Sequence, residues 1–71
     1  MADSLSDRIR EAREEAGLTQ EQMAPLIGVT LSTMGRYERG IGKRGITLDM
    51  PSRIAQATDK PIGFFLNEVA A

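Results

Sequence analysis

Four side chains that can donate hydrogen bonds fall within one short segment of the chain. They are Ser32, Thr33, Arg36 and Arg39. If residues 31–39 form a helix, Met34 and Tyr37 face inward and all four donors face solvent. The hydroxyls then stand beside the backbone amides of a helix N-terminus, which favours phosphate, and the Arg36 guanidinium one turn later suits a guanine edge. The pattern favours contact with nucleic acid, with an ordinary solvated helix face as the alternative for any single exposed arginine.

Residues 19–40 predict two short helices joined by a tight turn, which is the helix-turn-helix arrangement. Thr19 is expected to cap the first helix, and Gln22 completes a capping box three residues later. Gly28 supplies the turn, because glycine adopts a positive φ at no steric cost. Thr30 is expected to cap the second helix. The turn and the two caps together fix where the second helix begins, and this helix carries the polar segment.

Three residues depart from an ordinary frame of this kind. Pro25 removes a backbone donor inside the first helix and predicts a kink or a helix confined to its opening turns. Gly35 lies within the second helix, where we favour close packing against a neighbouring helix over close approach to DNA. Leu31 can offer only apolar contact, either to the core or to a group such as a thymine methyl. Both explanations of Leu31 stay open on the sequence alone.

The segment resembles the Cro/C1-type helix-turn-helix family of phage repressors and related bacterial regulators. The matching features are Leu18-Thr19-Gln20 at the first helix, Ala24, Gly28-Val29-Thr30 at the turn, and Tyr37-Glu38-Arg39-Gly40 at the end of the second helix. The resemblance covers most of the chain. It implies an all-α, compact five-helix bundle of the lambda-repressor-like DNA-binding type, in one domain over residues 1–71.

The resemblance also implies roles for individual residues. Base contacts in the major groove are implied at Leu31, Ser32 and Arg36. Contacts with the DNA backbone are implied at Gln20, Thr33, Arg39, Lys43 and Arg44. A structural ion pair is implied between Arg13 and Glu38.

Two further helices are expected on either side of the motif. The first spans about residues 5–16, with Ser4 as its cap, and its polar face, including Arg8, is expected to meet water. The other spans about residues 48–58 and directs Arg53 outward.

A short fifth helix is expected to begin near residues 59–61. Its apolar residues are Ile62, Phe64, Phe65, Leu66 and Val69. This is more apolar surface than so short a helix buries against one domain. We therefore expect a dimer interface at Phe64, Phe65 and Leu66, as the resembled family commonly forms two-fold dimers. Completion of the monomer core by both phenylalanines is the alternative.

Composition excludes several classes of function. The chain of 71 residues has no cysteine and no histidine, which removes disulfides and the usual zinc ligands. The loop at residues 41–47 lacks the Ser or Thr that a Walker phosphate loop needs after Gly42-Lys43. No apolar run approaches the ~20 residues of a membrane span, and the start of the chain is unlike a secretory signal, so a cytoplasmic location is expected.

The net charge of −1 argues against nucleic-acid binding, because domains that bind phosphates tend to be basic. Its distribution weakens that objection, since five cations and two anions lie between Arg36 and Arg53. A positive binding face is therefore compatible with an acidic remainder.

These observations predict a sequence-specific DNA-binding regulator of transcription, with repression as its expected mode. We expect a homodimer on double-stranded DNA with inverted half-sites, and no catalytic role, cofactor, metal or membrane contact. The alternatives are a protein-interaction module with the same fold, or the DNA-binding domain of a larger regulator. Phage, restriction-modification and toxin-antitoxin contexts all stay open.

Overall fold

The computed structural model describes residues 4–40 and 49–65. Within them lie four α-helices, α1 (Leu5–Glu15), α2 (Gln20–Ile27), α3 (Leu31–Glu38) and α4 (Met50–Thr58), and residues 63–65 begin a fifth. No strand occurs in these two stretches of chain. The expected all-α fold is confirmed. Lys43, Arg44 and Leu66 lie outside the described residues.

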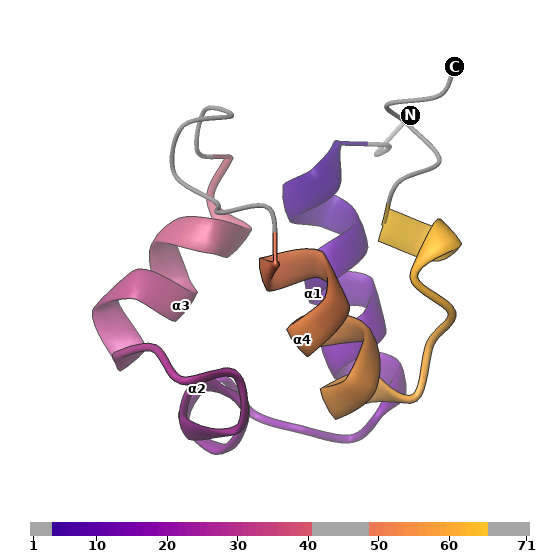
Figure 1. The fold of residues 1–71 in the computed structure, drawn as a ribbon. Coiled ribbons are helices and arrows are strands. Elements are labelled where there is room, and N and C mark those ends of the chain that lie inside the picture. Colours follow the sequence, from indigo (N-terminus) through magenta and orange to yellow (C-terminus); the bar gives the residue numbers. More distant parts are fainter. Residues whose placement is uncertain (1–3, 41–48, 66–71) are drawn as a thin grey trace.

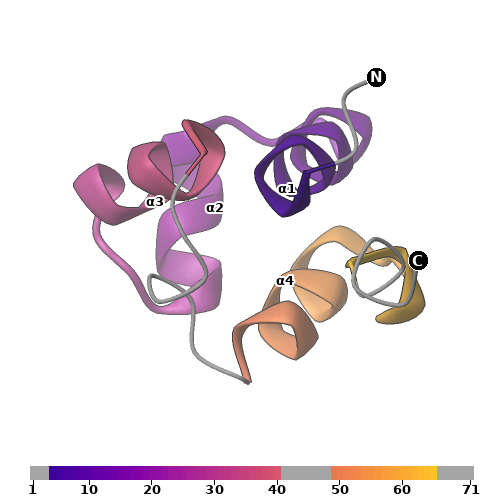
Figure 2. The ribbon, with the colours of Figure 1, turned by 90° about the horizontal axis from the view of Figure 1, so that it is seen from above.

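The helices surround one core. α2 packs against α3 and α4, and α1 packs against the same two helices (Figures 1 and 2). The buried apolar side chains are Ile9, Ala12, Met23, Ala24, Ile27, Met34, Tyr37, Met50, Ile54, Ala55 and Phe65. Every helix contributes to this cluster, so the position of α3 is fixed by the same contacts that stabilise the fold.

Local hydrogen bonds define the ends of α1, α2 and α3. The Thr19 hydroxyl accepts from the amide of Gln22, whose side chain in turn accepts from the amide of Thr19, so the capping box is complete. Ser4 and Thr30 cap α1 and α3 by accepting hydrogen bonds from the amides of Asp7 and Thr33. Gly28 ends α2 with φ 78°, as the turn requires. These features agree with the sequence-based expectation.

Pro25 does not confine α2 to its opening turns, because the helix continues to Ile27. The proline ring deletes a single amide, the one that would bond the carbonyl of Glu21. Both residues are exposed, so water can hydrate that carbonyl. The hydrogen bond lost at Pro25 therefore costs little, and burial of the Ile27 side chain in the core stabilises the last turn of the helix.

The chain after α4 folds back on α1. Asp59, at φ 58°, ends α4 in a left-handed conformation. The Phe64 ring then lies beneath two cations, with its centroid 5.4 Å from Arg8 Cζ and 4.9 Å from Lys60 Nζ. Arg8 also donates to the Phe64 carbonyl at 3.2 Å, and Lys60 pairs with Glu15. The expectation that Arg8 simply faces water is therefore wrong.

Phe65 is fully buried. Its ring meets Phe64 edge to face, with 5.1 Å between centroids, and packs into the core between α1 and α4. Because no part of the ring reaches the surface, Phe65 belongs to the core of this chain and not to a dimer interface. For Phe65 the alternative expectation, completion of the monomer core, is therefore the correct one, because the turn at Asp59 brings the segment back over the helices.

Candidate nucleic-acid interface

The exposed face of α3 carries the residues singled out by the sequence. Ser32, Arg36 and Arg39 are exposed, and Leu31 is 47% exposed. Thr33 is half-buried, since its hydroxyl accepts a hydrogen bond from Thr30 at 3.1 Å. The exposure of Leu31 rules out its core-packing explanation. Neither Arg36 nor Arg39 has an ion pair with another residue of the described ranges, so both cations are available to an anionic ligand.

The start of α2 joins this face through Gln20. Its side-chain amide donates to the Glu38 carboxylate at 3.1 Å, across the space between α2 and α3. A Cβ at Gly35 would lie 3.8 Å from Gln20 Oε1 and 3.8 Å from Arg39 Nη1. Gln20, Gly35 and Arg39 are therefore neighbours, and the N-terminal end of α2 is continuous with the exposed face of α3.

Gly35 is not required by helix packing. The distances of 3.8 Å are ordinary van der Waals contacts, so an alanine side chain would fit there. The explanation of Gly35 by close packing against a neighbouring helix is thus wrong. Gly35 is half-buried, and the missing Cβ leaves space for a methyl group between the α3 backbone and the side chains of Gln20 and Arg39.

A buried ion pair fixes α3 against α1. Arg13 Nε lies 2.6 Å from Glu38 Oε2, and Arg13 Nη2 donates to Glu38 Oε1 at 3.1 Å. The third donor, Nη1, bonds the Leu18 carbonyl at 2.8 Å. The hydrogen bonds to Glu38 raise the pKa of the Arg13 guanidinium above its ordinary value, against the opposing effect of burial. This is the ion pair that the resemblance implies.

The same carboxylate therefore serves two purposes. Glu38 is 7% exposed and holds both Arg13 from α1 and Gln20 from α2. Since Arg13 compensates the negative charge of Glu38, that carboxylate does not oppose the cations on the exposed side of α3. The sequence indicated the pair with Arg13 but gave no signal for the bond to Gln20, which depends on how α2 and α3 cross.

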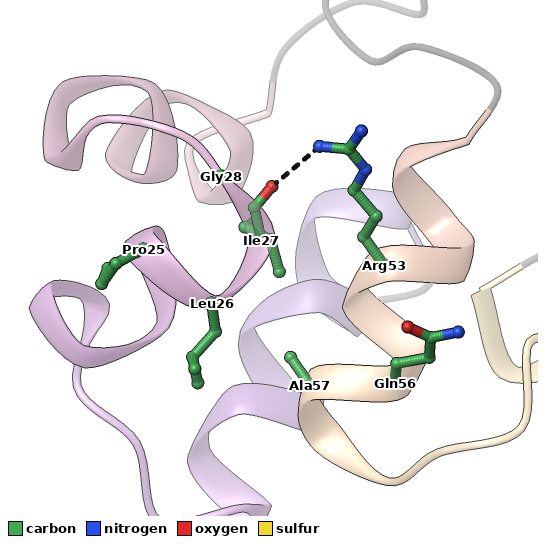
Figure 3. Close-up of a pocket in the computed structure, with 7 residues that line it drawn as sticks. All are labelled: Pro25, Leu26, Ile27, Gly28, Arg53, Gln56 and Ala57. Carbon is green, nitrogen blue, oxygen red and sulfur yellow. Dashed lines mark hydrogen bonds between the residues drawn. The ribbon is translucent and has the colours of Figure 1, made fainter.

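At its other end, α2 is held by Arg53 of α4. The Arg53 guanidinium donates to the Ile27 carbonyl at 3.4 Å (Figure 3). It also pairs with Asp49 at 3.1 Å. A cation at a helix C-terminus satisfies a carbonyl and complements the helix dipole. Arg53 is exposed as expected, but its structural contact with α2 was not foreseen.

An open depression lies beside this contact, between the end of α2 and α4. It is lined by Pro25, Leu26, Ile27, Gly28, Arg53, Gln56 and Ala57 (Figure 3). Leu26 is 60% exposed there. The depression lies at the opposite end of α2 from Gln20, and none of its lining residues lies on α3.

The fold and this surface define a helix-turn-helix domain. A family model described as helix-turn-helix matches residues 9–65. The chain accordingly belongs to the helix-turn-helix family of Cro/C1-type transcriptional regulators. This family is generally non-enzymatic.

Relatives from archaea and bacteria carry matching names. An uncharacterized HTH-type transcriptional regulator of Methanothermobacter thermautotrophicus is 45% identical over 49 residues, which cover 69% of this chain and 68% of the relative. A protein of Pyrococcus furiosus, provisionally named an HTH-type transcriptional regulatory protein, is 32% identical over 79% of this chain and 17% of its own length. An uncharacterized HTH-type transcriptional regulator of Sinorhizobium medicae is 28% identical over 64 residues, which cover 90% of this chain and 45% of the relative.

The chain thus spans less than half the length of two of these relatives. No solved structure matches it at a comparable level of significance. Across residues 4–40 and 49–65, no helix has the length and apolar character needed to cross a membrane. The same residues contain no group of three or more acidic side chains placed to hold a metal ion.

Proposed function

We propose that this chain binds double-stranded DNA sequence-specifically and represses transcription by occupying an operator. The observation that carries the proposal is that Gln20, half-buried at the start of α2, adjoins the surface formed by the exposed residues of α3 and Arg39. The two helices present their N-terminal ends to this face, where backbone amides favour phosphate. The domain acts in the cytoplasm by binding and not by catalysis.

In this proposal α3 lies in the major groove. Leu31, Ser32 and Arg36 contact base edges, with Arg36 placed to donate two hydrogen bonds to a guanine. Gln20, Thr33 and Arg39 contact the DNA backbone, as do Lys43 and Arg44, which follow in the sequence. Phosphate contacts set the register, and base contacts set the preferred sequence.

Two copies bind an inverted repeat. Phe64, which is half-buried, and Leu66 provide the dimer contact in this proposal. A two-fold dimer places its recognition helices ~34 Å apart, which is one turn of B-DNA, and so requires inverted half-sites.

Selection from a randomised duplex pool at near-physiological salt tests the proposal. The folded chain should enrich one inverted repeat, and the enriched sequence is the operator. Enrichment of a single unrepeated site would contradict the dimer. No enrichment from a chain shown to be folded by circular dichroism would reject sequence-specific DNA binding.

A second candidate is a protein-interaction module, or the binding domain of a larger regulator. Leu26 and Ile62 are 60% and 46% exposed, and exposed apolar side chains of this size can contact a partner protein. The partial coverage of the longer relatives also suits a domain that is joined to others. Failure of the DNA selection would favour the interaction module.

A further inference from the structure

We propose that Leu31 and Gly35 form a recess on α3 that takes the C5-methyl group of a pyrimidine in the major groove. The inference rests on the proposed function and adds the chemical group that this surface recognises. Two bases offer such a methyl group, thymine and 5-methylcytosine.

Leu31 supplies the apolar wall of the recess. It is the first residue of α3, and 47% of its surface is exposed among polar and cationic neighbours. Residues four apart in a helix are on the same side, so Gly35 follows Leu31 by one turn. An exposed leucine in a row of hydrogen-bond donors cannot bond a base edge, but it can cover a methyl group that water solvates poorly.

Gly35 supplies the floor. A glycine destabilises a helix relative to alanine, and here no packing contact requires it, since a Cβ would meet its nearest neighbours at 3.8 Å. The missing side chain therefore leaves space beside Gln20 and Arg39, at a half-buried position one turn after the exposed Leu31. A base edge can approach the backbone of α3 more closely at this point than elsewhere along the helix.

Gln20 and Arg39 border that space. The Glu38 carboxylate can only accept hydrogen bonds, which orients the Gln20 amide nitrogen toward it and leaves Oε1 beside Gly35. An acceptor is thus placed next to the recess, where the amino group of adenine or of 5-methylcytosine is available in the major groove. The cation of Arg39 on the other side suits a phosphate.

Base analogues in the selected duplex test the recess directly. Each thymine is replaced in turn by deoxyuridine, which lacks only the methyl group, and binding is measured by fluorescence anisotropy. We expect one position in each half-site to lose about three- to fivefold in affinity, the effect of one buried methyl group. Leu31→Ala should remove this discrimination, whereas Leu26→Ala, at an exposed leucine outside the polar face, should retain it.

Gly35→Ala provides the second test. Its melting temperature should equal or exceed that of the unchanged chain, because alanine favours a helix and fits the space. Its affinity for the thymine duplex should nevertheless fall, because the added methyl group occupies the recess. Retention of full affinity by Gly35→Ala would overturn the role of the glycine.

A cytosine arm distinguishes the two sources of the methyl group. The sensitive pair is replaced by cytosine-guanine with and without the 5-methyl group. Affinity for 5-methylcytosine above that for thymine would assign the recess to the modified base, and the reverse order would assign it to thymine. The proposal is overturned if no position responds to deoxyuridine, or if the response survives Leu31→Ala. Failure of the unchanged chain to retain any selected duplex would reject the proposed function itself.

Discussion

Arg36 in the last turn of α3 and Arg39 directly after that helix are both exposed, yet we expect them to contribute differently to binding. Arg36→Ala should weaken operator binding by ~1–3 kcal/mol and relax the preference at one base position, because a bidentate base contact is lost. Arg39→Ala should weaken binding to all sequences and reduce its dependence on salt. Anisotropy titrations against a panel of single-base operator variants separate the two effects.

Arg10→Ala is the matched control for charge, since Arg10 lies on α1 and pairs with Asp7. It should leave the preferred sequence unchanged. If Arg36→Ala also left the preferred sequence unchanged, the base contact assigned to Arg36 would be wrong.

The ion pair between Arg13 and Glu38 is expected to act on stability. Glu38→Ala leaves the guanidinium of Arg13 without its buried partner, and we expect a loss of roughly 3 kcal/mol in the free energy of unfolding. Urea denaturation followed by circular dichroism measures this loss. The double variant Arg13→Ala/Glu38→Ala should cost less than the sum of the single variants, since their effects share one interaction. Strict additivity would show that the two residues act independently.

At the level of secondary-structure elements, the joint between α2 and α3 depends on both a glycine and a cation. Gly28 has φ 78°, and a Cβ there would lie 3.2 Å from Arg53 Nη1. Gly17 has a similar φ of 74° but no atom within 4 Å of its Cβ position. Both Gly17→Ala and Gly28→Ala should lower the free energy of unfolding by ~1–2 kcal/mol, because a Cβ is disfavoured in the left-handed backbone conformation. Gly28→Ala should lose more, because Arg53 must move away from the Ile27 carbonyl.

Thermal unfolding in an Arg53→Ala background isolates that additional loss. There the two alanine substitutions should cost the same. If Gly28→Ala remained the costlier in this background, the difference would arise from the turn itself and not from Arg53.

The contact between α1 and the segment after α4 is expected to depend on pH. The hydrogen bond from Lys60 holds the pKa of Glu15 below its ordinary value of 4.5. A folded-state pKa below the unfolded one means that the pair adds stability above that ordinary value and loses it as the pH falls through the folded-state pKa. The difference in melting temperature between the unchanged chain and Glu15→Gln should therefore be present at neutral pH and shrink in strong acid. An equal difference at both pH values would contradict this linkage.

Elements held by local contacts were predictable from residue types and spacing, whereas the one distant contact expected from the sequence, between Arg13 and Glu38, came from the family resemblance. Thr19, Gln22 and Gly28 act on atoms within a few residues, so their types and spacing were sufficient. Arg8 bonds a residue 56 positions away and Arg53 one 26 positions away, and no local pattern indicates either contact. Leu31 stands at the boundary between the inward and outward faces of α3, so only the packed structure decided its exposure.

For the whole molecule, charge placement matters more than the net charge of −1. The exposed cations Arg36 and Arg39 lie within two residues of Glu38, whose charge is compensated internally by Arg13. The surface offered to DNA can therefore be positive although the chain as a whole is not. The long-range attraction is weaker than for a basic protein, so we expect moderate and salt-sensitive affinity.

The two-fold assembly that we propose would use surface that the monomer leaves exposed, which the buried Phe65 does not provide. Ile62 is 46% exposed and lies two residues before the proposed contact at Phe64. We therefore expect Ile62→Ser to weaken dimerisation and binding to the full inverted repeat, with little change in melting temperature. Phe65→Ala should instead lose ~3–5 kcal/mol of stability by opening a cavity in the core.

Analytical ultracentrifugation of complexes with full and half operators measures the number of bound chains. The unchanged chain should bind as two copies to the inverted repeat and more weakly, as one copy, to a half-site. Ile62→Ser should bind the half-site unchanged and lose only the advantage of the full repeat, because the base contacts lie on α3 and the dimer contact does not. If Ile62→Ser retained that advantage, the second copy would have to be joined through another surface, and the exposed Leu26 beside α4 would be the next to examine.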